Sequence, residues 1–477
     1  MQEKPLIAIV PMGHYVYFQQ FDGLYEELAR KAGQLTAYLD AEIANVLVTD
    51  YVDTVEKAFS AVKFLKSHDV DGVFLLLTTY LPSAVAAPFA VYLNVPTVLV
   101  GIQPRDHLDY GNCTTFMQLV NDDICAMPEI AGTFVRLGRP MPPCVVAASG
   151  QCKEIRHTIQ AIQRAMCAKA AFKYAIFGYL GHTYEGMYDM HTDPTAFTAA
   201  FGSHVKMLEM CELVNYTQQV SDDRIAQKIR VIQDTFSIQD PSVDPLTDYV
   251  QREDLELSAR SSCALDDIVE NNHLTALAYY YKGENGNLYE RIGASLIIGN
   301  SLLTSSGIPL AGEADLKTAA AMLIMNRIGG GGSFAELHPF DVEANAVLVG
   351  HDGPHNISIS EGKPILRKLK KYHGKAGSGI GVEFSLRTGE LTMLSMSLCR
   401  DGKFKLVAAL GRSICGLIPQ TGNTNTRIQF DIPITTFLRR WCEAGPTHHL
   451  ALGCGDRLDE IEYFARFMNL ELEIVAR

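Results

Sequence analysis

Two adjacent histidines and two separate glutamates are the residues of this sequence that could most readily do chemistry. His448 and His449 lie in GPTHHLALG, between a Gly-Pro turn and an apolar run. Glu313 lies where the loop of GIPLAGEADLKTAA enters an apolar helix, and Glu336 follows the glycines of GGGGSFAEL. His351 ends the apolar run of AVLVGHDGP. Such carboxylates and imidazoles suit Mn²⁺ or a similar divalent ion, and the lack of a nearby thiolate set disfavours structural zinc.

Each of these residues, taken singly, also has an ordinary structural explanation. A glutamate at a helix start is favoured by the helix dipole, and a histidine at a strand end is commonly structural or exposed. The GGGG stretch alone is typical of any mobile loop. In an extended segment neighbouring side chains point to opposite faces, so His448 and His449 cannot both be core residues. The surrounding elements must therefore bring the four segments together.

The first part of the chain alternates strands and helices. Apolar runs at 6–12, 41–52, 70–78 and 95–102 predict buried strands, and 21–35, 54–68 and 82–94 predict the helices between them. Continuous apolar strands joined by helices are typical of a doubly wound parallel sheet. Ligands of such sheets bind beyond the carboxyl ends of the strands, where several polar loops of this chain begin.

A second unit of this kind is predicted to begin near residue 173, with the strand of FKYAIFGYLG. From about residue 300 the sequence pattern changes to glycine-rich loops and short β-like runs, which favours an antiparallel sheet or barrel. The predicted fold is therefore α/β, with two Rossmann-like domains (1–172 and 173–300) followed by a β-rich, barrel-like C-terminal domain (301–477).

Composition narrows the class of protein. The 477 residues carry a formal net charge of -13, which argues against nucleic acid or an anionic membrane surface as the partner. The first ten residues lack the pattern of a signal peptide, and the most apolar long window is interrupted by Pro88, Asn94 and Pro96. The 11 cysteines are scattered and never spaced CxxC. These features predict a reduced, cytoplasmic protein.

Four segments together resemble the metal-site segments of the L-arabinose isomerase and L-fucose isomerase superfamily, and the arabinose branch more closely. They are AGEADLKTAA, GGSFAEL, LVGHDGP and GPTHHLAL, in that order and at similar separations. In the branch these read GEGDWKTAA, SF-x-E, GSH and a HHT-type pair. FMQLVND, TTYLPSAVAAPFAVYLNVPTVLV and LTALAYYY extend the resemblance over most of the chain.

The resemblance implies an aldose–ketose isomerase that works through a cis-enediol with a divalent metal, Mn²⁺ by family habit, or Co²⁺ or Mg²⁺. It also implies trimers or hexamers whose cleft is completed by a neighbour's N-terminal domain. Two carboxylates can exchange base and acid roles across the diol, and the metal can stabilise the developing oxyanion. The implied residues are Glu313, Glu336, His351 and His449 for the metal, Glu313 and Glu336 for proton transfer, and His448, His14, Tyr17, Asn121, Met187 and Tyr281 for substrate.

Departures from the branch fall at pocket positions, so the substrate could differ from L-arabinose. The candidates are another pentose, a deoxyhexose or an acidic hexose. Asn121 stands in place of a glutamine, Tyr281 of a phenylalanine and Leu316 of a tryptophan. Arg105 and His107 could bind an acidic sugar, although surface pairing with neighbouring aspartates is favoured. The alternatives are a sugar-binding protein or sensor on the same fold, or a metal-dependent epimerase or aldolase. A nicotinamide dehydrogenase is disfavoured, because no GxGxxG follows the first strand.

Overall fold

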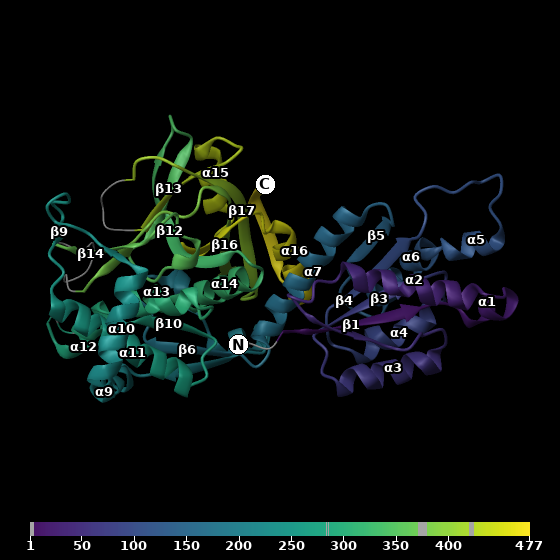
Figure 1. The fold of residues 1–477 in the computed structure, drawn as a ribbon, viewed down its shortest axis with the longest axis horizontal. Helices are drawn as coiled ribbons and strands as arrows, with labels where there is room; N and C mark the ends of the chain where they lie inside the picture. The colour runs from purple at the N-terminus through teal and green to yellow at the C-terminus, as the bar shows by residue number, and fades with distance from the viewer. Residues whose placement is uncertain (1–3, 283, 285, 371–378, 419–423) are drawn as a thin grey trace. The chain divides into compact units, whose positions relative to one another are not determined.

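The computed structural model describes residues 4–282, 284, 286–370, 379–418 and 424–477 (Figure 1). The chain divides into two compact units. Unit 1 comprises residues 1–170 and 460–469, and unit 2 comprises residues 171–459 and 470–477. The chain thus returns to unit 1 for one helix near its end. The three-domain division at residues 172 and 300 stays a prediction.

Unit 1 contains a five-stranded parallel sheet in the order β2-β1-β3-β4-β5. Four of these strands were expected as apolar runs, and the observed strands are shorter than or equal to those runs. The bounds are β1 (Leu6–Met12), β2 (Asn45–Val48), β3 (Gly72–Leu77), β4 (Thr97–Gln103) and β5 (Cys144–Ala148). Every residue of β3 is buried, as a central strand covered on both faces requires.

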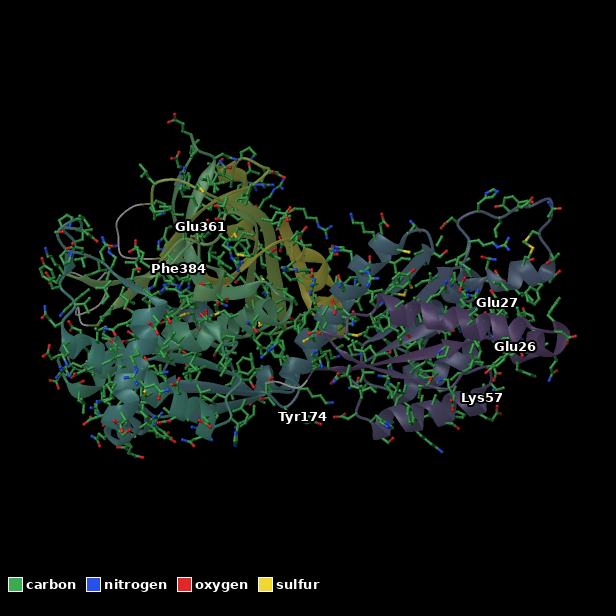
Figure 2. The ribbon with its side chains drawn as sticks, viewed as in Figure 1. Glu26, Glu27, Lys57, Tyr174, Glu361 and Phe384 are labelled. Carbon is green, nitrogen blue, oxygen red and sulfur yellow. The ribbon has the colours of Figure 1, made fainter. Side chains whose placement is uncertain are left out.

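Helices cover both faces of this sheet, which makes it doubly wound as predicted. One face packs against α3 (Val55–Ser67), α4 (Ser83–Tyr92) and α6 (Asp123–Arg136). The other packs against α2 (Leu24–Tyr38), α7 (Cys152–Phe172) and α16 (Leu458–Met468). Glu26 and Glu27 stand in the first turn of α2, where the helix dipole favours acidic groups (Figure 2). The short helix α1 (Tyr15–Gln20) lies in a segment expected as a loop after the first strand, and a second short helix, α5 (Thr115–Val120), precedes α6.

Unit 2 begins with a four-stranded parallel sheet in the order β11-β10-β6-β7. Its strands are β6 (Ile176–Gly181), β7 (His204–Leu208), β10 (Ala276–Tyr280) and β11 (Leu310–Ala311). The helices of this region are α8 (Pro194–Phe201), α9 (Met210–Gln219), α10 (Asp222–Thr235), α11 (Arg252–Asn271), α12 (Leu288–Ala294) and α13 (Ile297–Ser305). A small sheet joins β14 (Ile365–Leu369) to β15 (Gly381–Glu383), β8 (Ser237–Ile238) and β9 (Thr247–Asp248).

The C-terminal part of unit 2 is a closed barrel. Its strands follow the order β16-β19-β12-β13-β18-β17, and β16 also pairs with β17, which closes the circle; β20 (Glu471–Ala476) joins β17 in parallel. The bounds are β12 (Gly331–Asp341), β13 (Ala346–His351), β16 (Gly389–Leu398), β17 (Phe404–Ile414), β18 (Thr424–Gln429) and β19 (His449–Cys454). The barrel strands pair antiparallel, so the predicted fold class is confirmed.

Helix α14 (Leu316–Arg327) packs against β12, β16 and β19 of the barrel, and its first ten residues are all buried. A helix that is apolar all round needs such burial. Helix α15 (Ile434–Glu443) lies just before the histidine pair and buries Phe437 and Trp441. No helix among the described residues is long and apolar enough to cross a membrane.

Candidate metal centre

Glu313 lies in a strained turn between β11 and α14. Its backbone has φ 56°, and the next residue, Ala314, has φ 55°; both angles fall in the left-handed region. That conformation costs an L-residue roughly 1–2 kcal/mol, and strain of this kind is concentrated at functional sites. The turn is held by hydrogen bonds from Tyr184 N to Glu313 O (3.2 Å) and from Asp315 N to Gly312 O (3.1 Å). These bonds fix the backbone of the turn from which the Glu313 side chain extends.

Asp315 links the start of α14 to the histidine pair. Its carboxylate caps the helix by accepting hydrogen bonds from Thr318 N (3.1 Å) and Thr318 Oγ1 (2.8 Å). The same carboxylate lies 3.1 Å from Nδ1 of the fully buried His449. When Nδ1 donates to Asp315, the lone pair of Nε2 is free to bind a ligand. Nε2 of His449 lies 3.6 Å from Oε2 of Glu313.

The register of the barrel brings the other two residues to the same place. Glu336 of β12 lies opposite His449 of β19 on one side and opposite Gly350 of β13 on the other. His351 follows Gly350, and its Nε2 lies 4.0 Å from Oε1 of Glu313. Phe334 packs on both imidazoles, with ring centroids 4.7 Å from His351 and 4.4 Å from His449. Three strands and one strained turn therefore converge on one point.

The geometry of these groups fits a divalent cation. The ligand atoms of Glu336, His351 and His449 all lie within 4.8 Å of one another. Two ligands about 2.1 Å from one ion are about 3 Å apart when adjacent and about 4.2 Å apart when opposite. Oε2 of Glu313 and Nε2 of His449 are buried and have no hydrogen-bond partner among the described residues. Buried polar atoms without a partner are costly, and a bound cation at this point would satisfy both.

Nearby carboxylates affect the two imidazoles differently. Burial alone would lower the pKa of His351, but Oδ1 of Asp352, 3.2 Å from Nδ1, outweighs burial and raises that pKa above its ordinary value. Burial lowers the pKa of His449, and the bond to Asp315 only partly opposes it. His449 is therefore the imidazole more readily available in its neutral, metal-binding form.

His448 differs from its neighbour in burial and in partner. Its side chain is 36% exposed, and Asp189 accepts hydrogen bonds from both its backbone N (3.0 Å) and its Nδ1 (2.7 Å). The two imidazole centroids are only 3.9 Å apart. The two rings lie close together because His448 precedes β19 and strand alternation does not yet apply there. Only His449 is a core residue, so the prediction that the two histidines are not both core is confirmed. Glu313, His448 and His449 form a second group that could hold a metal ion.

The loop from 182 to 193 is tied to this site at two points. Asp189 binds His448, and the buried Lys317 donates to Thr192 Oγ1 (3.1 Å). Met187, predicted to contact substrate, lies in the same loop, two residues before Asp189. Tyr281 instead packs beside Tyr289, with ring centroids 5.8 Å apart. Burial raises the pKa of Tyr279 and Tyr280 on β10, and the negative charge of Glu313 adds to that effect. Burial, with Tyr184 and Glu313 nearby, raises the pKa of Tyr280 to about 12.

The remaining predicted residues belong to unit 1, near the carboxyl end of β1. The rings of His14 and Tyr17 are 5.0 Å apart, and burial, with Asp122 nearby, raises the pKa of Tyr17. Burial lowers the pKa of His14. Asn121 has a structural task as well: its side chain donates to Met117 O (2.8 Å) and accepts from Arg105 N (3.2 Å).

The expected surface pairing of Arg105 and His107 with aspartates is not observed. Asp106 accepts from Gly150 N (2.8 Å), and Asp109 accepts from Gly111 N (3.1 Å). Both side chains are nevertheless exposed, as a surface position requires.

Sequence reasoning missed four residues that the structure places around the centre. Asp315 caps α14, Lys317 lies in the first turn of that helix, and Asp189 lies in the loop that holds His448. His338 lies two residues after Glu336 on β12, with its Nε2 3.9 Å from Oε1 of Glu336. The D-x-x-T pattern at Asp315 signalled a helix cap, but not its bond to His449.

Comparison with known proteins finds sugar isomerases among the relatives of this chain. The family model of the L-arabinose isomerase central domain matches residues 190–331. The sulfoquinovose isomerase of Alkalicoccus urumqiensis is 23% identical over 319 residues, covering 66% of this chain and 68% of that protein. The sulfoquinovose isomerase of Priestia megaterium is 25% identical over 190 residues (39% and 42%). The L-arabinose isomerase of Klebsiella pneumoniae is 23% identical over 414 residues (85% and 80%). The comparisons therefore support the resemblance of this chain to the arabinose isomerase-like superfamily, with a diverged substrate.

Proposed function

We propose that this protein is a divalent-metal-dependent aldose–ketose isomerase. The observation that carries the proposal is that Glu336, His351 and His449 offer ligand atoms within 4.8 Å of one another. Glu313 lies 3.6 Å from His449 and 4.0 Å from His351, and its Oε2 and Nε2 of His449 are buried without a hydrogen-bond partner among the described residues. Its relatives are sugar isomerases by name, which supports the reaction class. The dependence on a metal is part of the proposal, and the resemblance to the isomerase superfamily implies that this metal is manganese.

The reaction moves a proton between two adjacent carbons of a sugar through a cis-enediol. A base removes the proton from the carbon that bears a hydroxyl, and the conjugate acid returns it to the neighbouring carbon. A divalent cation held by the four residues would supply Lewis-acid stabilisation of the oxygen that becomes negative. The residues that surround it would bind the sugar in one orientation and exclude water.

Glu313 and Glu336 are the proposed acid and base. Glu313 approaches from the strained turn and Glu336 from β12, so the two carboxylates reach the site from different elements. One of them must keep an oxygen directed at the substrate, because a carboxylate bound to metal through both oxygens is a poor base. His448 is the proposed substrate contact: Asp189 holds its Nδ1 proton, so Nε2 can accept a hydrogen bond from a sugar hydroxyl.

The proposed substrate is a small aldose, and the relatives named for L-arabinose and sulfoquinovose define the range to test. His14, Tyr17 and Asn121 of unit 1 are the proposed further contacts, supplied by a neighbouring copy in a trimer or hexamer. The exposed side chains of Arg105 and His107 would favour an acidic sugar.

The test uses purified protein that has been stripped with a chelator, with and without added Mn²⁺. L-Arabinose, L-fucose, sulfoquinovose and glucuronate are incubated with it in D₂O, and ketose and carbon-bound deuterium are followed by NMR. We expect metal-dependent ketose formation, with deuterium next to the carbonyl, from one of these sugars. Deuterium exchange without ketose would replace the isomerase by an epimerase-like enzyme. Sugar binding with no exchange in any arm would instead establish a binding protein or sensor.

A further inference from the structure

A pocket lies in unit 1, at the opposite end of the strands from the residues proposed to contact sugar. It has a volume of about 100 Å³ and is lined by residues at the amino ends of β4 and β5, together with parts of α4, α6, α7 and α16. His14 and Tyr17 instead follow the carboxyl end of β1. Because all five strands are parallel, these are opposite edges of the same sheet. The pocket is therefore separate from the proposed sugar contacts.

The charge of this pocket is opposite to that of the chain. Three lining residues are cationic, namely Arg139, Lys169 and Arg466; none of the sixteen lining residues, all within the described part of the chain, is acidic. The whole protein has a net charge of -13, so a group of cations without a carboxylate is not what its average composition would produce. Such a local positive field attracts anions.

The donors of the three cations are largely free. Arg139 uses one guanidinium nitrogen to bond Val91 O (2.9 Å), and Lys169 bonds Phe467 O (2.9 Å) near the end of α16. The side chain of Arg466 is exposed, and its charge reaches Cys144 at the start of β5. No ion pair joins Arg139, Lys169 or Arg466 to a carboxylate among the described residues. A guanidinium offers five N–H donors, so most donors here remain available.

The remaining walls of the pocket are largely apolar. Phe89, Leu93, Phe134, Met141 and Phe467 contribute large side chains, and four prolines complete the lining. Met141 is 54% exposed, which places an apolar group at the mouth. The volume corresponds to about three water molecules, enough for an anionic group with part of a ring inside and the rest against the mouth.

We propose that this pocket binds an organic phosphate monoester whose apolar body packs against the aromatic wall. Three cations favour a dianion over a monoanion, and guanidinium groups match phosphate oxygens in bidentate hydrogen bonds. Arg139 follows α6, whereas Arg466 lies on α16, so one phosphate bound to both would fasten α16 to the rest of unit 1. The ligand would then act as a regulator or stabiliser from outside the sugar site.

Isothermal titration calorimetry on the full chain tests this proposal with phenyl phosphate, inorganic phosphate and benzyl alcohol. We expect saturable one-to-one binding of phenyl phosphate, at least about tenfold tighter than inorganic phosphate, and no measurable binding of benzyl alcohol. R466Q should weaken phenyl phosphate binding about tenfold without affecting the fold, because Arg466 is exposed. R139Q provides a second, independent variant.

The matched control is R136Q, since Arg136 is an exposed arginine on α6 that does not line the pocket. Its affinity for phenyl phosphate should equal that of the wild type. Equal affinity in wild type and R466Q, or an equal loss in R136Q, would overturn the site. Equal binding of inorganic and phenyl phosphate would overturn the role of the apolar wall. Binding should be unchanged in the chelator-stripped protein, so the outcome does not depend on the isomerase proposal.

Discussion

Two groups of buried charged residues, one in each unit, show how a structural cluster differs from a ligand site. In unit 1 the ammonium of Lys31 donates to Thr78 O (2.9 Å), Val120 O (3.0 Å) and the carboxylate of Asp123, so all three of its donors are used. In unit 2 Oε2 of Glu313 and Nε2 of His449 are equally buried, 3.6 Å apart, and lack such partners among the described residues. The pair in unit 1 leaves Oδ2 of Asp123 without a partner among the described residues, whereas in unit 2 unpaired atoms from separate elements lie close together. Polar groups paired within the protein hold the fold together, whereas convergent unpaired groups can hold a ligand.

The largest difference should appear in turnover. E313Q and E336Q each remove a carboxylate from the centre while keeping the shape of the side chain. We expect each to lower kcat by at least about 10³-fold, because general acid–base catalysis and charge stabilisation are both lost. Ketose formation measures the effect, and circular dichroism should show an unchanged fold.

The control for this pair is E343Q, since Glu343 is an exposed glutamate beyond the end of β12. It should retain wild-type kcat. Full activity in both E313Q and E336Q would remove them from the mechanism.

The corresponding substitution in unit 1, K31M, should lower the free energy of unfolding. K31M leaves the buried Asp123 carboxylate without its partner, which typically costs about 3–5 kcal/mol of unfolding free energy. The double variant K31M/D123L should recover most of that loss, because no charge is then buried alone. Urea denaturation measures both. A K31M protein as stable as the wild type would show that the pair does not hold unit 1 together.

A smaller effect is expected at Asp315, which both caps helix α14 and contacts the proposed metal ligand His449. D315N keeps a helix cap but weakens the hold on Nδ1 of His449, so Mn²⁺ affinity should fall about 10- to 100-fold. D193N is the matched control, because Asp193 caps α8 by accepting from Thr195 N and contacts no residue of the centre. Equal Mn²⁺ affinity in D315N and wild type would mean that Asp315 only caps α14.

Metal binding should also depend on pH. The pKa of His351 is raised above 6.5 by Asp352, so this imidazole must lose a proton before it can bind metal. Mn²⁺ affinity should therefore rise as the pH increases through that pKa, and D352N should shift the midpoint to lower pH. A pH-independent affinity between pH 6 and 8 would contradict the ligand role of His351.

The smallest expected effect concerns strain outside the site. His273 is exposed and adopts φ 51° just after α11, the conformation in which glycine is preferred. H273G should raise the unfolding free energy by up to about 1 kcal/mol and leave turnover unchanged. The result is measured by urea denaturation. A lower unfolding free energy in H273G would mean that the imidazole of His273 itself stabilises the fold. His273 could then not serve as the reference for the cost of the left-handed backbone at Glu313.

Much of the fold could be predicted from the sequence, because its strands are continuous apolar runs. Strand β3 is one such run, buried throughout as a central parallel strand must be. The meeting of the site residues in space was harder to predict from the sequence. Glu336 meets His449 only through the pairing of β12 with β19, which are more than a hundred residues apart in the chain. The four segments were found by resemblance rather than by spacing.

Other features depended on contacts that no local pattern encodes. Asp189 reaches His448 across 259 residues of chain, and Asp315 reaches His449 across 134. The alternation rule does not apply at His448, because that residue lies just outside β19. The predicted contact Tyr281 was two residues from Tyr279, whose phenol feels the Glu313 charge. Sequence patterns thus located the segments, and tertiary contacts decided which side chains meet.

The most direct test of the account is anomalous diffraction at the manganese edge from crystals grown with Mn²⁺. The account predicts one strong peak within about 2.3 Å of Glu313, Glu336, His351 and His449. A peak bound by Glu313, His448 and His449 without Glu336 and His351, or no peak in unit 2, would contradict it.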